Sequence, residues 1–254
     1  MSIARNTVLL LKSEKSEDAQ DKYQDILESN KFEVMVVKTL TFQYKNIEIL
    51  RDKLTNPDDF CGIILSSPRC VNACSQALGK ERIHELWKLK SNFTVGEATY
   101  NEALIKIGIE CEGKESGNAR NLSQIIVQSK SSFNKPFLFP HGNLKTDTLK
   151  LELGRENLSL DEVLVYDTLP NPQIKEDLEK VTSGFSSIPE YLVFFSPSGF
   201  HSSIHYLRKV PIDLSSLKII AIGPVTQLAI EENNLKVYAV AKAPTPEEVL
   251  KAIL

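Results

Sequence analysis

The sequence predicts an α/β protein made of two similar lobes, each built on a parallel β-sheet. Short apolar segments alternate with helix-forming segments along the 254 residues, an order typical of parallel sheets covered by helices. The second half also repeats the first. Residues 63–69 recur as 192–198, an offset of 129 (67 to 196). Residues 96–99 recur as 223–226, an offset of 127 (96 to 223).

The repeat extends over most of the chain. Its further matched pairs are 8–10 with 137–139, 39–40 with 168–169, and 122–126 with 249–253. A period of about half the chain is too long for a solenoid and indicates an internal duplication. Two similar lobes usually hold a ligand between them, so we expect a ligand cleft between the lobes.

The first copy is expected to open with a strand, a helix and a strand, followed by a polar interval that ends in a turn at 56–59. Gly62–Leu65 is a short, fully apolar run, typical of a parallel strand covered on both faces. Ser66-Ser67-Pro68 then supplies an N-cap serine and a proline for the first helical position. The expected segments are strand 8–11, helix 23–28, strand 32–37, strand 62–65, a helix opened by 66–68, a charged helix 80–90, strand 93–95, a helix from 97 or 98, an apolar segment 107–111, and helix 119–128.

A polar seam at 129–135 precedes the second copy, which repeats this order. Apolar runs and helical spacing again alternate, with turn residues between them. The expected segments are strand 137–139, helix 144–153, strand 163–166, helix 174–181, strand 191–195, helix 199–208, strand 218–222, helix 226–232, strand 237–240, and helix 246–253.

Composition excludes several classes of protein. The net charge of −3 and the pI near 5.9 argue against a nucleic-acid-binding protein, which needs a basic surface. No stretch approaches the ~20 apolar residues of a membrane span, and the run 7–11 is too short for a signal peptide. The four cysteines form no CxxC pair, and Cys70 and Cys74 lie on the apolar stripe of a predicted helix. We expect a soluble, cytoplasmic protein without membrane or nucleic-acid partners.

A small-residue turn that leads from a strand into a helix recurs five times. The turns are 66–68, 96–99, 142–145, 196–199 and 223–226. In open α/β sheets such turns line the ligand crevice, and the free N–H groups of each helix start attract anions. Together they favour a polyanionic ligand. Each turn taken alone is equally well explained as a helix cap.

Three other side chains stand out as candidates for chemistry. His201 and His205 have the i,i+4 spacing of a metal pair, but no acidic third ligand lies nearby in sequence, and a solvated helix face explains them as well. His141 lies in one of the crevice turns. Tyr166 matches Val37 in the first copy, so duplication does not account for its phenol, which could pack a hinge or donate a proton into the cleft.

The ordered set of these motifs resembles the uroporphyrinogen-III synthase family. The segments that carry the resemblance are ILSSPR (64–69), VGEAT (95–99), SGNA (116–119), FPHGNLK (139–145), VYDT (165–168), FFSPSG (194–199), AIGPVT (221–226) and PTP (244–246). Each segment is weak alone, but their order and spacing cover nearly the whole chain. The resemblance implies a discontinuous first lobe at 1–37 and 171–254, a second lobe at 42–165, and linker strands at 38–41 and 166–170.

The resemblance also implies a reaction and a substrate. The substrate would be hydroxymethylbilane, a linear tetrapyrrole bearing eight carboxylates. It would lose its terminal hydroxyl as water and close, through a spiro intermediate, to uroporphyrinogen III with ring D inverted. The family uses no metal or cofactor, so catalysis would come from holding the chain in the right conformation. We expect a monomer that receives its substrate by transient hand-over from the preceding pathway enzyme.

Carried over residue by residue, the resemblance assigns site roles. Tyr166 would assist departure of the hydroxyl, which is acid catalysis. The side chains expected to hold substrate carboxylates are Ser67, Arg69, Thr99, Lys145, Ser196, Ser198 and Thr226.

Two other functions fit the same sequence. A two-lobed cytosolic binding or sensor protein for a polyanionic small molecule would have the same duplication and crevice, although the sequence contains no helix-turn-helix or other output module. A metal-dependent enzyme using His201 and His205 is the second alternative.

Overall fold

The computed structural model of the chain describes residues 2–13, 21–129, 133–209 and 214–254. The chain divides into two compact units, unit 1 (Met1–Thr41 and Leu169–Leu254) and unit 2 (Phe42–Thr168). Both boundaries fall inside strands, β2 (Glu33–Tyr44) and β6 (Leu160–Pro170), so the chain passes from one unit to the other twice in mid-strand. The predicted α/β class with parallel strands is confirmed. The internal duplication and the cleft stay predictions.

Unit 1 is a parallel sheet in the order β2-β1-β7-β8-β9. Besides β2, its strands are β1 (Ser2–Ser13), β7 (Ser187–Phe194), β8 (Lys218–Ala221) and β9 (Ala239–Val240). In the central strand β1, Val8 and Leu10 pack into one core and Leu9 and Leu11 into another. All four are fully buried. The run 8–11 is apolar throughout because both faces of the sheet are covered.

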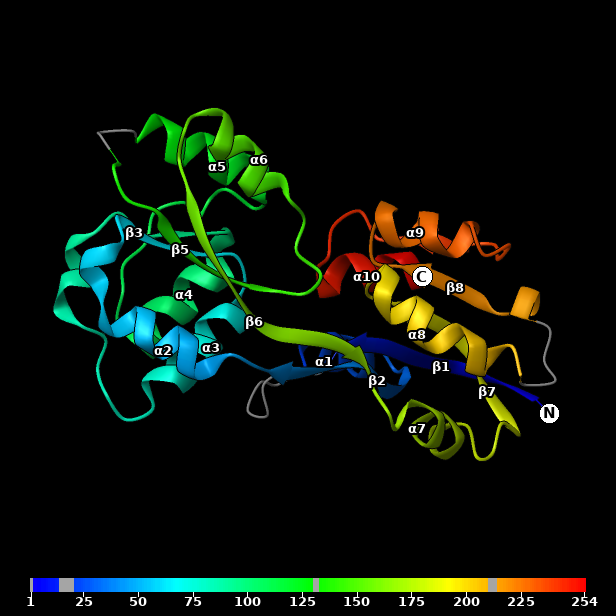
Figure 1. The fold of residues 1–254 in the computed structure, drawn as a ribbon. Coiled ribbons are helices and arrows are strands. Elements are labelled where there is room, and N and C mark those ends of the chain that lie inside the picture. The colour runs from blue at the N-terminus through cyan, green and yellow to red at the C-terminus, as the bar shows by residue number, and fades with distance from the viewer. Residues whose placement is uncertain (1, 14–20, 130–132, 210–213) are drawn as a thin grey trace. The chain divides into compact units, whose positions relative to one another are not determined.

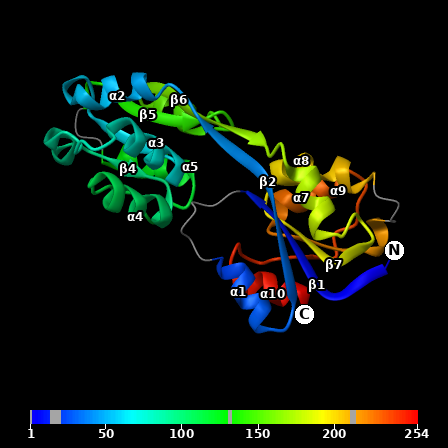
Figure 2. The same ribbon diagram turned by 90° about the horizontal axis from the view of Figure 1, so that it is seen from below.

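Helices cover the two faces of this sheet separately. Helices α1 (Lys22–Ser29) and α10 (Pro246–Ile253) lie side by side on one face, as Figure 2 shows. The other face is covered by α7 (Ile174–Val181), α8 (Pro197–Leu207) and α9 (Pro224–Glu231). A short 3-10 turn, Leu214–Ser216, precedes β8.

Unit 2 follows the same plan with the strand order β4-β3-β5-β6. Its strands besides β6 are β3 (Gly62–Leu65), β4 (Phe93–Thr94) and β5 (Phe137–Gly142). One face packs against α2 (Ile47–Thr55), α3 (Pro68–Leu78) and α4 (Gly96–Ile107), and the other against α5 (Ala119–Gln128) and α6 (Thr148–Arg155) (Figure 1). Two 3-10 turns, Pro57–Asp59 and Glu85–Leu89, complete it.

Most expected elements are present, and three helices have the predicted bounds. These are 119–128, 174–181 and 246–253. Helix α2 was not predicted, because its segment looks polar in sequence. Two of its apolar residues, Leu50 and Leu54, are buried in the structure. The expected seam at 129–135 includes residues 130–132, which lie outside the described residues.

Two expected helices are wrong in extent. The segment 80–90 contains only the 3-10 turn Glu85–Leu89, because hydrogen bonds made by side chains fix its conformation. The Trp87 indole donates to the Leu54 carbonyl at 2.7 Å, and the Asn92 side chain donates to the Trp87 carbonyl at 2.6 Å. The helix expected at 144–153 begins only at Thr148. The Asn143 N–H donates to the Tyr166 carbonyl at 3.1 Å and keeps the chain beside β6.

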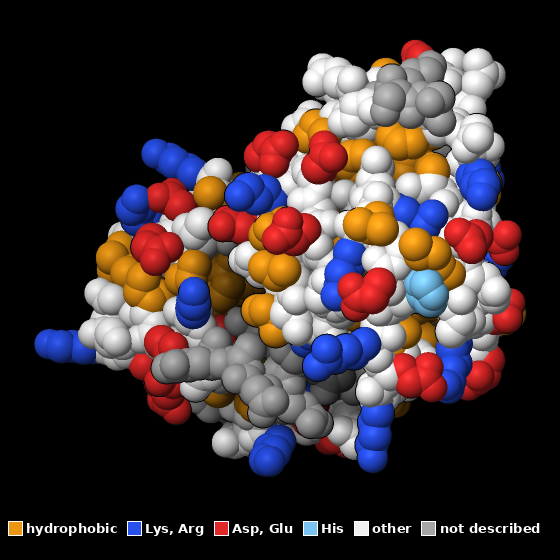
Figure 3. Space-filling view, turned by 90° about the vertical axis from the view of Figure 1, so that its left-hand side faces the viewer, with side chains coloured by type: hydrophobic (Ala, Val, Ile, Leu, Met, Phe, Trp, Pro, Cys, Tyr) orange, Lys and Arg blue, Asp and Glu red, His pale blue; other side chains and the backbone are white. Residues whose placement is uncertain are grey.

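Charged side chains of both signs are interspersed over the face of the molecule shown in Figure 3. This mixture is consistent with the small net charge of −3. Among the described residues, no helix is both long enough and apolar enough to cross a membrane.

A glycine pair tests the packing of unit 2. A Cβ on Gly62 would lie 1.8 Å from the Ser91 carbonyl oxygen. A Cβ on Gly154, at an exposed position of helix α6, would meet nothing within 4 Å. We expect Gly62→Ala to lower the free energy of unfolding by about 1–3 kcal/mol or more, because backbone must move. Gly154→Ala should raise it by about 0.5–1 kcal/mol. Denaturant midpoints measure both, and equal midpoints would contradict the close approach at Gly62.

Candidate active site

Tyr166 lies in strand β6 at the carboxyl end of the unit 2 sheet. Its backbone is fixed from two sides: its carbonyl accepts the Asn143 N–H at 3.1 Å, and the neighbouring Val165 carbonyl accepts the Lys45 N–H at 2.9 Å. Gly142 pairs with Tyr166 in the sheet, and a Cβ on Gly142 would lie 2.4 Å from the phenol Cζ. The phenol end of the Tyr166 ring therefore lies close to the backbone of residue 142, a position that only glycine there allows.

Two aromatic rings and one hydroxyl complete the surroundings of the phenol. The rings of Phe42 and Tyr44 meet the Tyr166 ring edge to face, with centroids 6.1 and 6.4 Å away. The Tyr166 hydroxyl lies 3.4 Å from Ser67 Oγ. Burial raises the pKa of the phenol, with a further contribution from Cys70, and the Ser67 hydrogen bond and the Arg69 charge oppose this only in part. The phenol therefore keeps its proton at neutral pH and can donate it.

Ser67 is placed by the start of helix α3. Strand β3 ends at Leu65, Ser67 has extended backbone (φ −160°), and Pro68 takes the first helical position. The Ser67 hydroxyl accepts the Cys70 N–H at 3.4 Å. The predicted cap is confirmed, and the same hydroxyl contacts Tyr166. One side chain thus serves both as a cap and as part of the candidate site.

Arg69, in the first turn of α3, lies over an aromatic ring. Its guanidinium carbon is 3.5 Å from the Phe42 ring centroid, a cation–π contact. Burial lowers the pKa of Arg69, and the nearby Tyr166 and Tyr44 oppose that shift. A guanidinium stays charged under these conditions. Unit 2 therefore holds a positive charge beside the phenol.

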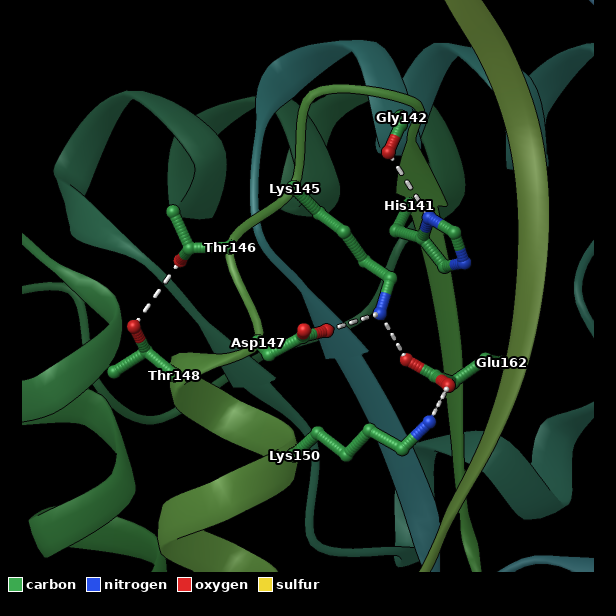
Figure 4. Close-up of polar contacts among 8 residues, drawn as sticks. All are labelled: His141, Gly142, Lys145, Thr146, Asp147, Thr148, Lys150 and Glu162. Atoms are coloured by element: carbon green, nitrogen blue, oxygen red, sulfur yellow. Dashed lines mark hydrogen bonds and ion pairs between the residues drawn. The ribbon is translucent and has the colours of Figure 1, made fainter.

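Lys145 lies in the loop after β5 and belongs to an ion-pair network (Figure 4). Its ammonium contacts Glu162 and lies 3.5 Å from an Asp147 carboxylate oxygen. Lys150 binds the other Glu162 oxygen at 2.9 Å. Burial tends to raise the pKa of Glu162, but hydrogen bonds from the two lysines outweigh it and lower that pKa. A substrate carboxylate at Lys145 would have to compete with Glu162.

His141 lies next to this network. Its Nδ1 is 3.0 Å from the Gly142 carbonyl oxygen, and burial lowers the pKa of its imidazole. The ring is mostly neutral at pH 7 and adds no charge to the loop.

In unit 1, two of the predicted hydroxyls lie together at the start of α8. Ser196 caps the helix by accepting the Gly199 N–H at 3.0 Å, and its Oγ is 3.3 Å from Ser198 Oγ. Both side chains are partly exposed. Thr226 in α9 and, in unit 2, Thr99 in α4 are each only 2% exposed. These two threonines are therefore buried.

The histidine pair gains no third ligand. Within the described ranges, no group of three His, Cys, Asp or Glu side chains lies close enough to hold a metal ion. His201 and His205 instead contact the rings of Phe200 and Tyr206, with centroids 5.4 and 3.7 Å apart.

Phe42 and Tyr44 are site residues that the sequence reasoning missed. They lie at the end of β2, beyond the strand expected at 32–37. Leu40, Phe42 and Tyr44 alternate with the polar residues Thr41 and Gln43, a period-2 pattern that would have extended the strand to Tyr44.

The contact between Gly142 and Tyr166 generates a prediction. In Gly142→Ala the new Cβ would push the phenol, which is the mobile end of a side chain, rather than backbone. We expect turnover to fall at least about tenfold, because a misplaced catalytic group loses its alignment, while the unfolding midpoint changes less than in Gly62→Ala. Turnover equal to that of Gly154→Ala would contradict a catalytic position for Tyr166.

Comparison with known proteins gives one consistent result. A family model described as uroporphyrinogen-III synthase HemD matches residues 21–251. A uroporphyrinogen-III synthase of Saccharomyces cerevisiae is 27% identical over 256 residues, covering 92% of this chain and 90% of that protein.

Solved structures agree on the fold. The uroporphyrinogen-III synthetase of Helicobacter pylori aligns with a TM-score of 0.65 at 16% identity over 96% of each chain. A mutant enzyme from Thermus thermophilus aligns with a TM-score of 0.59 at 14% identity over 97% of this chain and 96% of that one. With a family model that spans almost the entire chain, this protein belongs to the uroporphyrinogen-III synthase family.

Proposed function

We propose that this chain converts hydroxymethylbilane into uroporphyrinogen III. The family match over residues 21–251 carries the proposal. In this reaction the terminal hydroxyl takes up a proton and leaves as water, which produces an azafulvene. The substituted position of ring D attacks the azafulvene carbon and forms a spiro intermediate. Rearrangement of that intermediate closes the macrocycle with ring D inverted. The family match does not favour the alternative of a non-catalytic binding or sensor protein.

Tyr166 is our candidate for the proton donor. Its phenol is half-buried, protonated at neutral pH, and held by backbone on one side and by the rings of Phe42 and Tyr44 on others. Rigid placement of a donor at the departing hydroxyl lowers the barrier to its departure. The product water carries away the transferred proton, and the proton that ring D loses as the macrocycle closes restores the phenol.

The remaining side chains would hold the eight carboxylates of the substrate. In unit 2, Arg69 supplies a positive charge whose orientation is set by Phe42, and Ser67 supplies a hydroxyl. In unit 1, Ser196 and Ser198 form a hydroxyl pair at a helix start, where a carboxylate is stabilised. Lys145, Thr99 and Thr226 stay candidates, although Lys145 is already paired and both threonines are buried.

We also propose a cytoplasmic monomer in which residues 38–41 and 166–170 act as linker strands. The charged residues of the predicted surface helices support a monomer, since extended apolar patches mark interfaces. The linear substrate cyclises spontaneously to isomer I, so rapid hand-over from the preceding enzyme would limit that loss.

A coupled assay tests the function. Hydroxymethylbilane is generated in place, purified protein is added, and the uroporphyrin isomers are separated after oxidation. We expect isomer III to predominate, whereas the same mixture without the protein should give isomer I. Isomer I alone from folded protein would refute the enzymatic function and favour a binding protein.

Tyr166→Phe tests the donor. Phenylalanine keeps the ring contacts but has no proton to give, so kcat should fall at least about tenfold. The unfolding midpoint should change little, because the 3.4 Å hydroxyl contact to Ser67 is long. Tyr238→Phe, which removes a phenol that is 53% exposed in unit 1, is the matched control. Equal kcat in both variants would leave Tyr166 only a packing role.

A further inference from the structure

A buried thiol lies directly behind the candidate proton donor. Cys70 Sγ is 3.3 Å from Ser67 Oγ and 3.7 Å from Ser66 Oγ, and Ser67 Oγ is in turn 3.4 Å from the Tyr166 hydroxyl. Cys70 itself is fully buried. Thiol, serine and phenol thus form a continuous chain of polar contacts inside unit 2.

The helix cap does not require this thiol. At the offset of 129 seen in the sequence, Cys70 matches Gly199 (70 to 199). Gly199 has no side chain, yet Ser196 caps α8 in the same way, with φ −166° against −160° at Ser67. The cap of α8 forms with no side chain at this position, so the cap of α3 does not need the Cys70 side chain.

Counting donors and acceptors limits the hydrogen-bond chain to two directions. A serine hydroxyl has one proton and two lone pairs. One Ser67 lone pair already accepts the Cys70 N–H at 3.4 Å. Sulfur is both a weak donor and a weak acceptor. In one direction the Ser67 proton goes to the Tyr166 oxygen and the second lone pair accepts the S–H; in the other the Ser67 proton goes to sulfur and that lone pair accepts the phenol proton. Only the first direction leaves the phenol proton free. Burial raises the pKa of Cys70, so the thiol keeps the proton that it donates.

We propose that Cys70 is a positioning residue, whose S–H fills the second acceptor site of Ser67 and so leaves the Tyr166 O–H free for substrate. Without the thiol, Ser67 could accept the phenol proton, and the donor would point inward. The proposal rests on the proposed function only in naming the leaving hydroxyl as the target. The direction of the hydrogen-bond chain is a property of the resting protein.

Three substitutions in α3 test the proposal. Cys70→Ala removes the donor, Cys70→Ser keeps a donor, and Cys74→Ala removes a second buried thiol one helical turn away. We expect Cys70→Ala to lower kcat about three- to tenfold with little change in KM, the value of one hydrogen bond. Cys70→Ser and Cys74→Ala should stay within about twofold of the wild type. Equal kcat values for Cys70→Ala and Cys74→Ala would overturn the proposal.

A double variant separates positioning from general damage. In Tyr166→Phe there is no phenol proton to orient, so adding Cys70→Ala should lower kcat no further. If the two losses in kcat multiply, Cys70 acts elsewhere and the proposal is wrong.

A second readout needs no turnover and so distinguishes failure of this proposal from failure of the proposed function. Absorbance titration of the tyrosines, with Tyr166→Phe as the reference, gives the pKa of the phenol. Cys70→Ala and Cys70→Ser both lack a thiolate, while Arg69 and Tyr44, the other groups that act on the phenol, are unchanged. The pKa should be higher in Cys70→Ala, where Ser67 no longer donates to the phenol oxygen. Identical pKa values would refute the hydrogen-bond chain even if the protein made no isomer III.

Discussion

Residues 8–11 of β1 and the whole of β3 are buried on both faces of their sheets, and the rest of the structure depends on this constraint. Alternate residues of each strand enter different cores, so Val8 and Leu9, or Ile63 and Ile64, have no solvent-facing side. A polar side chain inside such a strand would lose its water without compensation. Chemistry is therefore restricted to the strand ends, where the backbone leaves the sheet. Ser67, Ser196 and Gly223 each lie within two residues of such an end.

At one of those ends the structure combines a neutral acid with a fixed cation. Partial burial holds the Tyr166 proton in place, and the guanidinium of Arg69 is kept in place by the face of Phe42. The two groups have different tasks in a reaction that both protonates a leaving group and binds carboxylates. Because Arg69 lies on α3 and Tyr166 on β6, the cation and the phenol have different neighbouring groups. Lys145 shows the opposite case, because its charge is neutralised by Glu162 of β6 and by Asp147.

Much of this arrangement could be predicted from the sequence, and the exceptions have physical causes. The apolar runs and the Ser-Pro caps are local signals, and the strands and helix starts that depend on them were found. The helix expected at 80–90 failed because the Trp87 indole binds the Leu54 carbonyl and the Asn92 side chain binds the Trp87 carbonyl, contacts that no helical spacing in the sequence encodes. The contact of Tyr166 with Gly142 is likewise a product of strand pairing, and no spacing in the sequence encodes it. Phe42 was missed because the end of β2 was placed too early.

The discontinuous make-up of unit 1 has a consequence for biosynthesis. Strand β1 is made long before its partner β7, which begins at Ser187, and the two strands pair between Ser2 and Leu11. At typical translation rates the intervening residues take on the order of ten to thirty seconds to make. Throughout that time the apolar edge of β1 is open on the β7 side, while unit 2, a continuous segment, can already fold. A nascent chain of this design is most exposed to aggregation, and most in need of chaperones, along β1.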